Sequence, residues 1–172
     1  MGFQEILNDK TLKPKEKTEK LSQLVLNTPD VNEELISFAK ISKDPIKATV
    51  IESFEFATKL NPEIASKSML HFVTQTLTEK APRVKWESAK VIGNIAHLYP
   101  KQLDEAINHL LINTEHPGTV VRWSAAFALS QIVKLNTPLN NELIPTIKNI
   151  CEREEKNSIK KIYLDGLKKV KQ

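Results

Sequence analysis

The sequence of 172 residues is 40% hydrophobic and 27% charged, which are the proportions of a folded globular chain and exclude a disordered one. Its net charge of +4 comes almost entirely from lysine, because arginine occurs only at positions 83, 122 and 153; this balance disfavours specific recognition of nucleic-acid phosphates. No apolar run approaches the roughly 20 residues of a membrane-spanning helix, no secretory signal is recognisable, and the single Cys151 excludes an intramolecular disulfide. We therefore expect a cytoplasmic protein with no membrane partner, folded as one domain over 1–172.

Prolines mark the places where helices are expected to begin. Pro29, Pro62 and Pro138 each follow one or two Asn or Thr residues. Proline is tolerated in the first turn of a helix, and an Asn or Thr before it can cap the free backbone N–H groups. The segments between the prolines are rich in Leu, Ile, Ala, Lys and Glu, which favour helix. The expected helices cover 14–27, 30–42, 44–60, 62–79, 82–98, 101–114, 118–135, 139–154 and 157–170, and a short helix at 3–8 also fits the pattern.

An internal repeat organises these helices. The segment 84–98 returns as 121–135, and the alignment extends to four anchor positions that are 38, 37 and 38 residues apart. The anchors are Ile46, Val84, Val121 and Ile159. Apolar residues recur at the fifth, eighth and eleventh positions after each anchor and at the fourteenth after the first three, so they share one helical face and predict a core stripe. That stripe comprises Ile51, Ala89, Ala126 and Leu164; Phe54, Ile92, Leu129 and Leu167; Ala57, Ile95, Ile132 and Val170; and Leu60, Leu98 and Leu135.

Small residues stand at fixed places in the two central repeats. Gly93 and Ser130 occupy the ninth position after their anchors. We expect them to let neighbouring helices approach closely. A single helical pair of this kind cannot bury its own apolar face, so the pairs must stack into a continuous array.

The central segments resemble a known repeat family. Two segments look like the second helix of a HEAT repeat: Val84-Lys85-Trp86-Glu87-Ser88-Ala89-Lys90-Val91-Ile92-Gly93-Asn94-Ile95-Ala96 and Val121-Arg122-Trp123-Ser124-Ala125-Ala126-Phe127-Ala128-Leu129. Leu143-Ile144-Pro145 resembles the first helix of such a repeat, where a proline often stands. The resemblance implies an all-α, right-handed superhelix of about four repeats at 29–61, 62–99, 100–137 and 138–172. Residues 1–28 are expected to form a polar cap, since Lys17 and Lys20 fall where apolar residues should stand.

A basic residue follows each anchor. These four residues, Lys47, Lys85, Arg122 and Lys160, are expected to form a ladder along the stack. One interpretation is a stripe that binds anions, either nucleic acid or an acidic partner. The other, which we favour, is structural: each cation would pair with an acid near the preceding turn. The candidate acids are Asp44, Glu79, Glu115 and Glu154 or Glu155.

The outward positions of the central second helices form the candidate binding surface. Aromatic side chains among amides and cations are typical of protein-binding surfaces, where tryptophan often supplies much of the affinity. The alternative is that each indole packs half-buried over the neighbouring repeat. The candidate partner-binding residues are Trp86, Lys90, Asn94, Trp123, Phe127 and Gln131.

The sequence contains no candidate catalytic site and no candidate metal site. DNA-alkylation-repair glycosylases, whose HEAT-like arrays also carry tryptophans, need a carboxylate one turn from such a Trp, where this chain has Lys90 and Phe127. Iron-binding HEAT hydroxylases use His-Glu pairs, and this chain has no such dipeptide; Glu105 and His109 share a helix face, but two ligands are too few. We expect no cofactor and no metal.

These observations lead to two functional hypotheses. The first is a non-catalytic scaffold or adaptor that binds a partner protein or peptide on the concave face of the second helices. The second is a HEAT-like protein that binds nucleic acid through the Lys/Arg ladder and the tryptophans, with a possible relation to DNA alkylation repair. Neither hypothesis indicates an oligomeric state.

Overall fold

The structure, a computed structural model, describes residues 1–170 and contains helices but no strands over that range. The end of the expected fourth repeat, 171–172, lies outside the described residues. The α-helices in chain order are α1 (Phe3–Asn8), α2 (Pro14–Asn27), α3 (Val31–Lys40), α4 (Asp44–Leu60), α5 (Lys67–Thr76), α6 (Pro82–Ile95), α7 (Asp104–Asn113), α8 (Thr119–Val133), α9 (Asn140–Arg153) and α10 (Asn157–Lys168). Two short 3-10 helices, η1 (Pro62–Ile64) and η2 (Ala96–Leu98), lie beside α5 and α6 in the chain.

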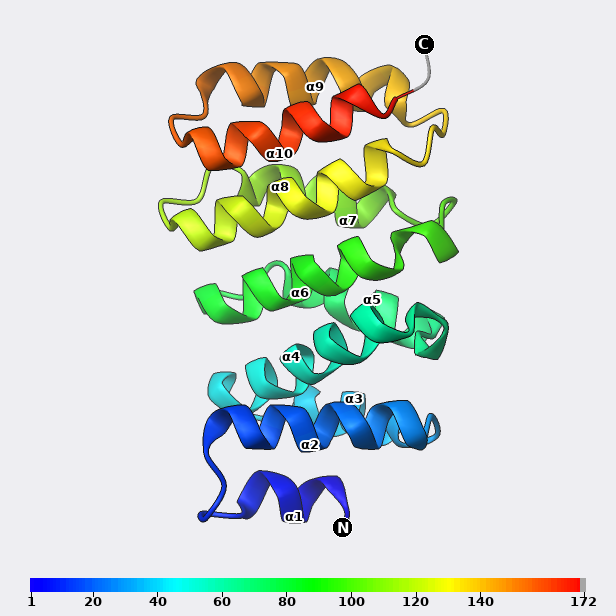
Figure 1. The fold of residues 1–172 in the computed structure, drawn as a ribbon, viewed down its shortest axis with the longest axis vertical. Coiled ribbons are helices and arrows are strands. Elements are labelled where there is room, and N and C mark those ends of the chain that lie inside the picture. The colour runs from blue at the N-terminus through cyan, green and yellow to red at the C-terminus, as the bar shows by residue number, and fades with distance from the viewer. Residues whose placement is uncertain (171–172) are drawn as a thin grey trace.

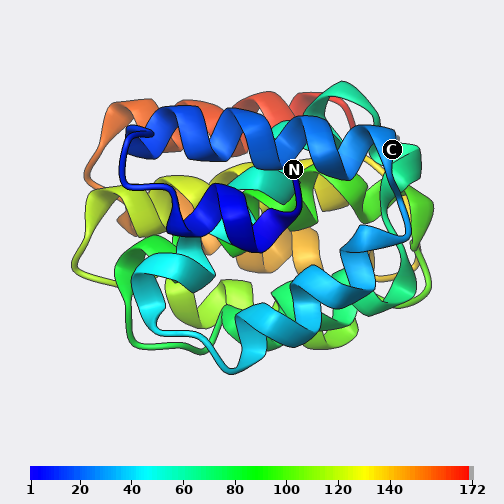
Figure 2. The same cartoon turned by 90° about the horizontal axis from the view of Figure 1, so that it is seen from below.

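The helices stack as a two-layered solenoid. One layer contains the second helices α2, α4, α6, α8 and α10, and the other contains α3, α5, α7 and α9 (Figure 1). Figure 2 looks along this stack with α1 and α2 nearest the viewer. The expected fold class, an all-α right-handed solenoid, is confirmed. Among the helices of residues 1–170, none combines the length and apolar character needed to cross a membrane.

The two layers differ in how closely their helices approach. Each second helix packs along the length of the next one, whereas α3, α5 and α7 touch one another much less. Closer packing on one side is the arrangement expected of the inner side of a curved stack. We call the outward side of α2, α4, α6, α8 and α10 the second-helix face.

Proline and a serine cap explain where several helices begin. Proline stands in the first turn of α2, α4, η1 and α6, where its missing N–H has no helical partner. The helix expected at 62–79 is instead interrupted, because Ser66 adopts an extended backbone and its hydroxyl accepts a hydrogen bond from the Met69 N–H at 3.1 Å. That cap starts α5 anew after η1, a break that the apolar pattern did not predict.

The predicted core stripe is mostly confirmed. The residues at the eighth and eleventh positions of the first three repeats are fully buried between the layers. Gly93 and Ser130 are also buried. Three predictions were wrong, since Ile46 is 37%, Leu60 72% and Leu164 49% exposed. Ile46 and Leu60 lie at the ends of α4, where fewer neighbours cover them. In α10, Tyr163 enters the core, and α10 is the last member of the second-helix layer in the described chain, so no further second helix packs on it.

Residues 1–28 were expected to form one polar cap, but α1 and α2 have different places in the fold. Leu21 and Val25 of α2 are fully buried against α4, so α2 is a full member of the second-helix layer. Lys17 does not face the core, because its ammonium donates to the Leu7 carbonyl at 2.8 Å. The end of the stack is covered by α1, whose Phe3 ring meets the Phe38 ring edge-on at 5.3 Å.

Candidate functional site

An aromatic pair lies on the outward side of α8, in the central part of the second-helix face. The rings of Trp123 and Phe127, one turn apart on α8, are stacked with centroids 6.0 Å apart and planes 10° from parallel. Trp123 is 38% exposed and Phe127 half-buried. A β-carbon on Gly93 of α6 would collide with the Phe127 ring, so the absence of that carbon lets the ring settle on α6. The pair therefore packs on α6 through the Phe127 ring, while the Trp123 indole remains partly exposed to solvent.

Trp86, the equivalent of Trp123 on α6, has a different environment. It is half-buried, and its indole N–H donates to Glu87 Oε1 at 2.8 Å. The Lys90 ammonium lies 3.5 Å from the same oxygen. Trp86 and Lys90 are thus brought together with a carboxylate, whereas Trp123 carries no such attachment in the contacts of residues 1–170.

Two buried carboxyls lie beneath this part of the face. Glu87 is 4% and Glu55 of α4 is 8% exposed, and burial raises the pKa of both groups. Glu87 Oε2 is buried without a hydrogen-bond partner within the described residues. Sequence reasoning missed them because a glutamate on an amphipathic helix is ordinarily placed in solvent. For Glu55 one signal was available, because it occupies the ninth position after its anchor, where the two central repeats carry the small residues Gly93 and Ser130.

The two amide candidates also differ. Asn94 donates from Nδ2 to the Glu55 carbonyl and to Thr58 Oγ1, both at 3.1 Å, and so connects α6 to α4. Gln131, at the equivalent position of α8, is half-buried. Asn94 is therefore committed to the stacking of repeats in this structure.

Most side chains of the basic ladder form hydrogen bonds or ion pairs with other residues of this protein. Lys47 is 8% exposed and donates to Glu79 at 2.9 Å, while Arg122 pairs with Glu154 at 3.1 Å and donates to the carbonyls of His116 and Pro117. Lys85 donates to the Leu77 carbonyl at 3.1 Å and to Asn113 Oδ1 at 3.2 Å. Lys160, the fourth member, is half-buried.

The expected acid partners of the ladder were wrong by one repeat. Glu79 and Glu154 lie just after the first helix of the repeat that follows Lys47 and Arg122, respectively, so each pair joins two repeats. Stacking places the end of one first helix beside the start of the preceding second helix, a relation that sequence proximity cannot show. Burial lowers the pKa of Lys85; Glu154 has a lowered pKa because hydrogen bonds and Arg122 outweigh the opposing effect of its burial.

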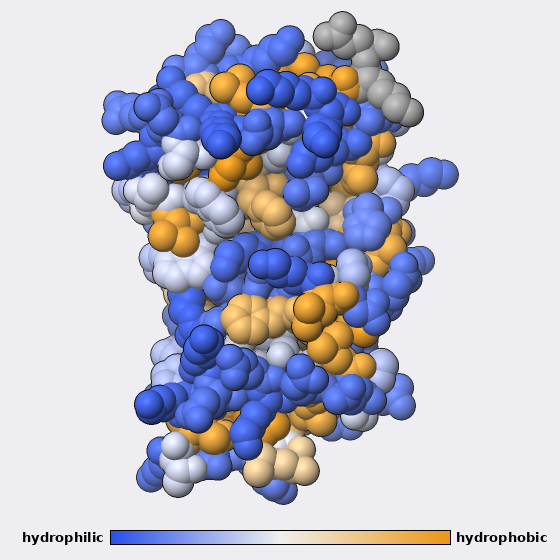
Figure 3. Space-filling view, in the orientation of Figure 1, coloured by the Kyte–Doolittle hydropathy of each residue, from blue (hydrophilic) through white to orange (hydrophobic). Residues whose placement is uncertain are grey.

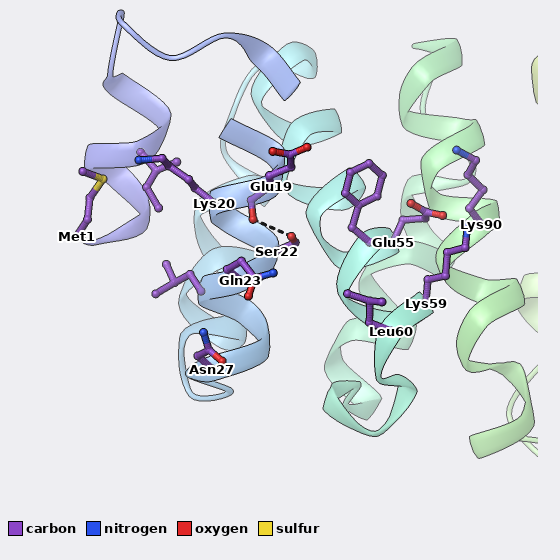
Figure 4. A pocket seen from close by; sticks show the side chains of 13 residues that line it. Met1, Glu19, Lys20, Ser22, Gln23, Asn27, Glu55, Lys59, Leu60 and Lys90 are labelled. Atoms are coloured by element: carbon purple, nitrogen blue, oxygen red, sulfur yellow. Dashed lines mark hydrogen bonds between the residues drawn. The ribbon is translucent and has the colours of Figure 1, made fainter. Parts of the chain in front are cut away.

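A cleft at the N-terminal end of the second-helix face was not predicted. Its volume is about 1030 Å³, and α1, α2 and α4 contribute most of its lining. We call it the α2–α4 cleft (Figure 4). It is lined by Met1, Ile6, Glu19, Lys20, Ser22, Gln23, Leu24, Asn27, Glu55, Phe56, Lys59, Leu60 and Lys90. The repeat pattern gave no signal for it, because α1 and α2 lie outside the four aligned repeats.

The side chains considered for metal binding stay apart. Within residues 1–170, no group of three or more His, Cys, Asp or Glu side chains is placed to hold a metal ion. His109 lies 3.4 Å from Glu105, which also accepts a hydrogen bond from Gln75 at 2.7 Å. Cys151 is buried among apolar neighbours.

Comparisons with known proteins identify the fold. No family model matches the sequence, and no curated protein does so. A computationally designed armadillo repeat protein for modular peptide recognition superposes with a TM-score of 0.72 at 12% identity, over 98% of this chain and 81% of that one. A designed armadillo repeat protein in complex with the peptide (KR)4 gives 0.71 at 16% identity, over 96% and 78%. An engineered protein gives 0.68 at 16% identity, again over 96% and 78%.

These similarities show an armadillo-type α-solenoid. At such low identity they carry the fold alone. They give no support to the HEAT family in particular or to a relation with DNA repair.

Proposed function

We propose that this protein is a non-catalytic scaffold that binds a partner protein or peptide on its second-helix face. The observation that carries the proposal is the stacked pair of Trp123 and Phe127, which presents an exposed indole on a regularly stacked layer of helices. Exposed tryptophans on otherwise polar surfaces are among the side chains that contribute most to protein interfaces.

The support beneath the pair favours binding over packing. Phe127 rests on Gly93 and fixes one side of the indole, so Trp123 loses little side-chain freedom when a partner covers its other side. Binding then costs less conformational entropy than ordering a mobile side chain would.

The shared architecture supports a peptide as one form of partner. Two of the structurally similar proteins are described by their recognition of peptides. A stack of parallel helices offers equivalent outward positions at regular intervals, which suits an extended chain segment. This support comes from the fold and not from matching binding residues, because identity is low.

The buried carboxyls give little support to catalysis. Glu87, the carboxyl beside Trp86, is 4% exposed and already accepts the indole N–H, so a substrate on the face would meet the indole first. The nucleic-acid alternative also has less support, because the side chains of Lys47, Lys85 and Arg122 already form hydrogen bonds or ion pairs with other residues of this protein. We retain the cytoplasm as the proposed location, which suits a single buried thiol.

A peptide-display selection against the intact protein tests the proposal. Peptides enriched on the wild type should lose about tenfold or more in affinity for Trp123→Ala, as expected for a central aromatic contact. Ile112→Ala is the matched control, since Ile112 is 68% exposed on α7 in the other layer. If enriched peptides bind Trp123→Ala as well as the wild type but lose affinity for the Ile112 variant, the second-helix face is not the binding surface.

A further inference from the structure

The α2–α4 cleft exposes apolar surface that nothing in the described chain covers. Leu60 is 72% and Met1 69% exposed, and Leu24 and Phe56 are half-buried in its lining. Figure 3 shows apolar side chains gathered over α4, between polar bands that follow the neighbouring helices. Clustered exposed apolar residues inside a concave, polar-rimmed site are typical of docking surfaces.

Three ammonium groups stand around the cleft. Lys20 extends on the α1 side, whereas Lys59 and Lys90 lie on the opposite side, around Glu55 (Figure 4). Lys20 and Lys59 are exposed, and neither forms a hydrogen bond or ion pair with other residues of the described chain.

The acids of the cleft do not balance these lysines at the surface. Glu55 is 8% exposed, so its carboxylate lies beneath the surface that a ligand would contact. Glu19 is exposed and lies 4.0 Å from Lys15. The charge that a ligand meets in the cleft is therefore predominantly positive, although the sequence there contains both signs.

We propose that the α2–α4 cleft binds an acidic peptide segment of the partner that carries one bulky apolar side chain. The apolar side chain packs against Leu24, Phe56 and Leu60, and carboxylates on either side of it pair with Lys20 and Lys59. The inference rests on the proposed function, because it assigns the chemistry of the partner that this face binds.

The cleft is continuous with the aromatic part of the face. Lys90 lines the cleft and also contacts Glu87, which holds the Trp86 indole. A segment anchored in the cleft therefore passes Lys90 and Trp86 on α6 before it reaches Trp123 on α8. The cleft supplies charge selection and an anchor, and the aromatic pair adds affinity along the same chain.

Fluorescence polarisation with three labelled peptides tests this assignment. The peptides share one central Phe and differ only in flanking residues, which are Glu, Gln or Lys. The acidic peptide should bind most tightly and should weaken as salt is added. Lys20→Glu with Lys59→Glu should lower its affinity about five- to tenfold, and Leu60→Ser should lower it by a similar factor.

A charge-matched variant controls for long-range electrostatics. Lys101→Glu with Lys148→Glu changes the net charge equally at exposed positions outside the cleft, and should lower the affinity less than about twofold. Circular dichroism melting of each variant confirms that it folds. The substituted residues Lys20, Lys59 and Leu60 are exposed, so their loss should leave the core intact.

The outcomes separate this inference from the proposed function. The inference is overturned if the Lys or Gln peptide binds more tightly than the acidic peptide, or if the cleft variants bind the acidic peptide as well as the wild type does. It is also overturned if a single-stranded oligonucleotide binds in place of the acidic peptide, or if sedimentation detects a self-dimer that buries Leu60. If peptides from the display selection still depend on Trp123 in those cases, the proposed function stands. If no peptide class and no displayed peptide binds, both are wrong.

Discussion

The Phe127 ring on α8 occupies the space beside Gly93 on α6 in which a β-carbon would lie. The contact joins two equivalent helices of successive repeats, and the same ring is stacked under the Trp123 indole. Gly93, a small residue that allows close packing of the two helices, thus also determines where the Phe127 ring and the stacked Trp123 indole lie. Packing between repeats and presentation of the candidate site are therefore one structural feature.

Gly93→Ala should displace the aromatic pair. The added methyl group collides with the Phe127 ring, and overpacking of this kind costs about 1–3 kcal/mol, against a gain of up to about 1 kcal/mol in helix propensity. We expect a lower free energy of unfolding in urea and a shifted tryptophan emission. Gly2→Ala is the control, because no atom lies within 4 Å of its added carbon. A rise in stability with unchanged fluorescence would show that the ring yields without strain.

Arg122→Met should destabilise the stack by about 2–3 kcal/mol. The substitution leaves Glu154, whose side chain is 5% exposed, without its charged partner between two repeats. Lys15→Met, which breaks the exposed pair with Glu19, should cost less than about 1 kcal/mol. Equal losses for the two variants in urea denaturation would contradict a structural role for the ladder.

The same ion pair should give the protein an acid-sensitive component of stability. The pKa of Glu154 is lowered in the folded state, so its contribution is present above the ordinary value of 4.5 and is lost as pH falls below that value. In Arg122→Met this part of the acid dependence should shrink. Urea denaturation from neutral to acidic pH measures the difference between wild type and variant.

Glu87→Gln should stabilise the protein by about 1 kcal/mol at neutral pH, because it removes a buried charge while its amide oxygen still accepts the Trp86 N–H. The pKa of Glu87 is raised on folding, so its contribution to stability falls as pH rises through the range above 4.5. The gain in Glu87→Gln should therefore vanish on acidification below that value. Glu34→Gln, at an exposed position of α3, is the control. Destabilisation at neutral pH would mean that the Lys90 pair outweighs the penalty of burial.

Phe3→Ala should release α1 without unfolding the stack. Phe3 is 9% exposed and contacts Phe38, and α1 is only six residues long, with Phe3 and Ile6 as its buried residues. Hydrogen exchange should show loss of protection in 3–8 and unchanged protection in α4 and α6. Met1→Ala, at a 69% exposed position, should leave α1 protected. Loss of protection throughout α2 as well would place both helices in one cooperative unit.

The spacing of Ile46, Val84, Val121 and Ile159 was sufficient to predict a repeated helical pair and most of its core. Helical periodicity and capping are local properties, so a single sequence displays them directly. The same logic identified Gly93 as a packing residue and placed Trp123 and Phe127 on the outward side of α8.

The partners across repeats were decided by the tertiary structure alone. Lys47 pairs with Glu79 and Arg122 with Glu154 because the rotation between successive repeats brings one helix end beside another, and no local pattern encodes that rotation. Burial of Glu55 and Glu87 and the shape of the α2–α4 cleft depend on the same rotation. The sequence therefore determined the repeating unit and its core, and stacking of the units determined which side chains meet and which remain open to a partner.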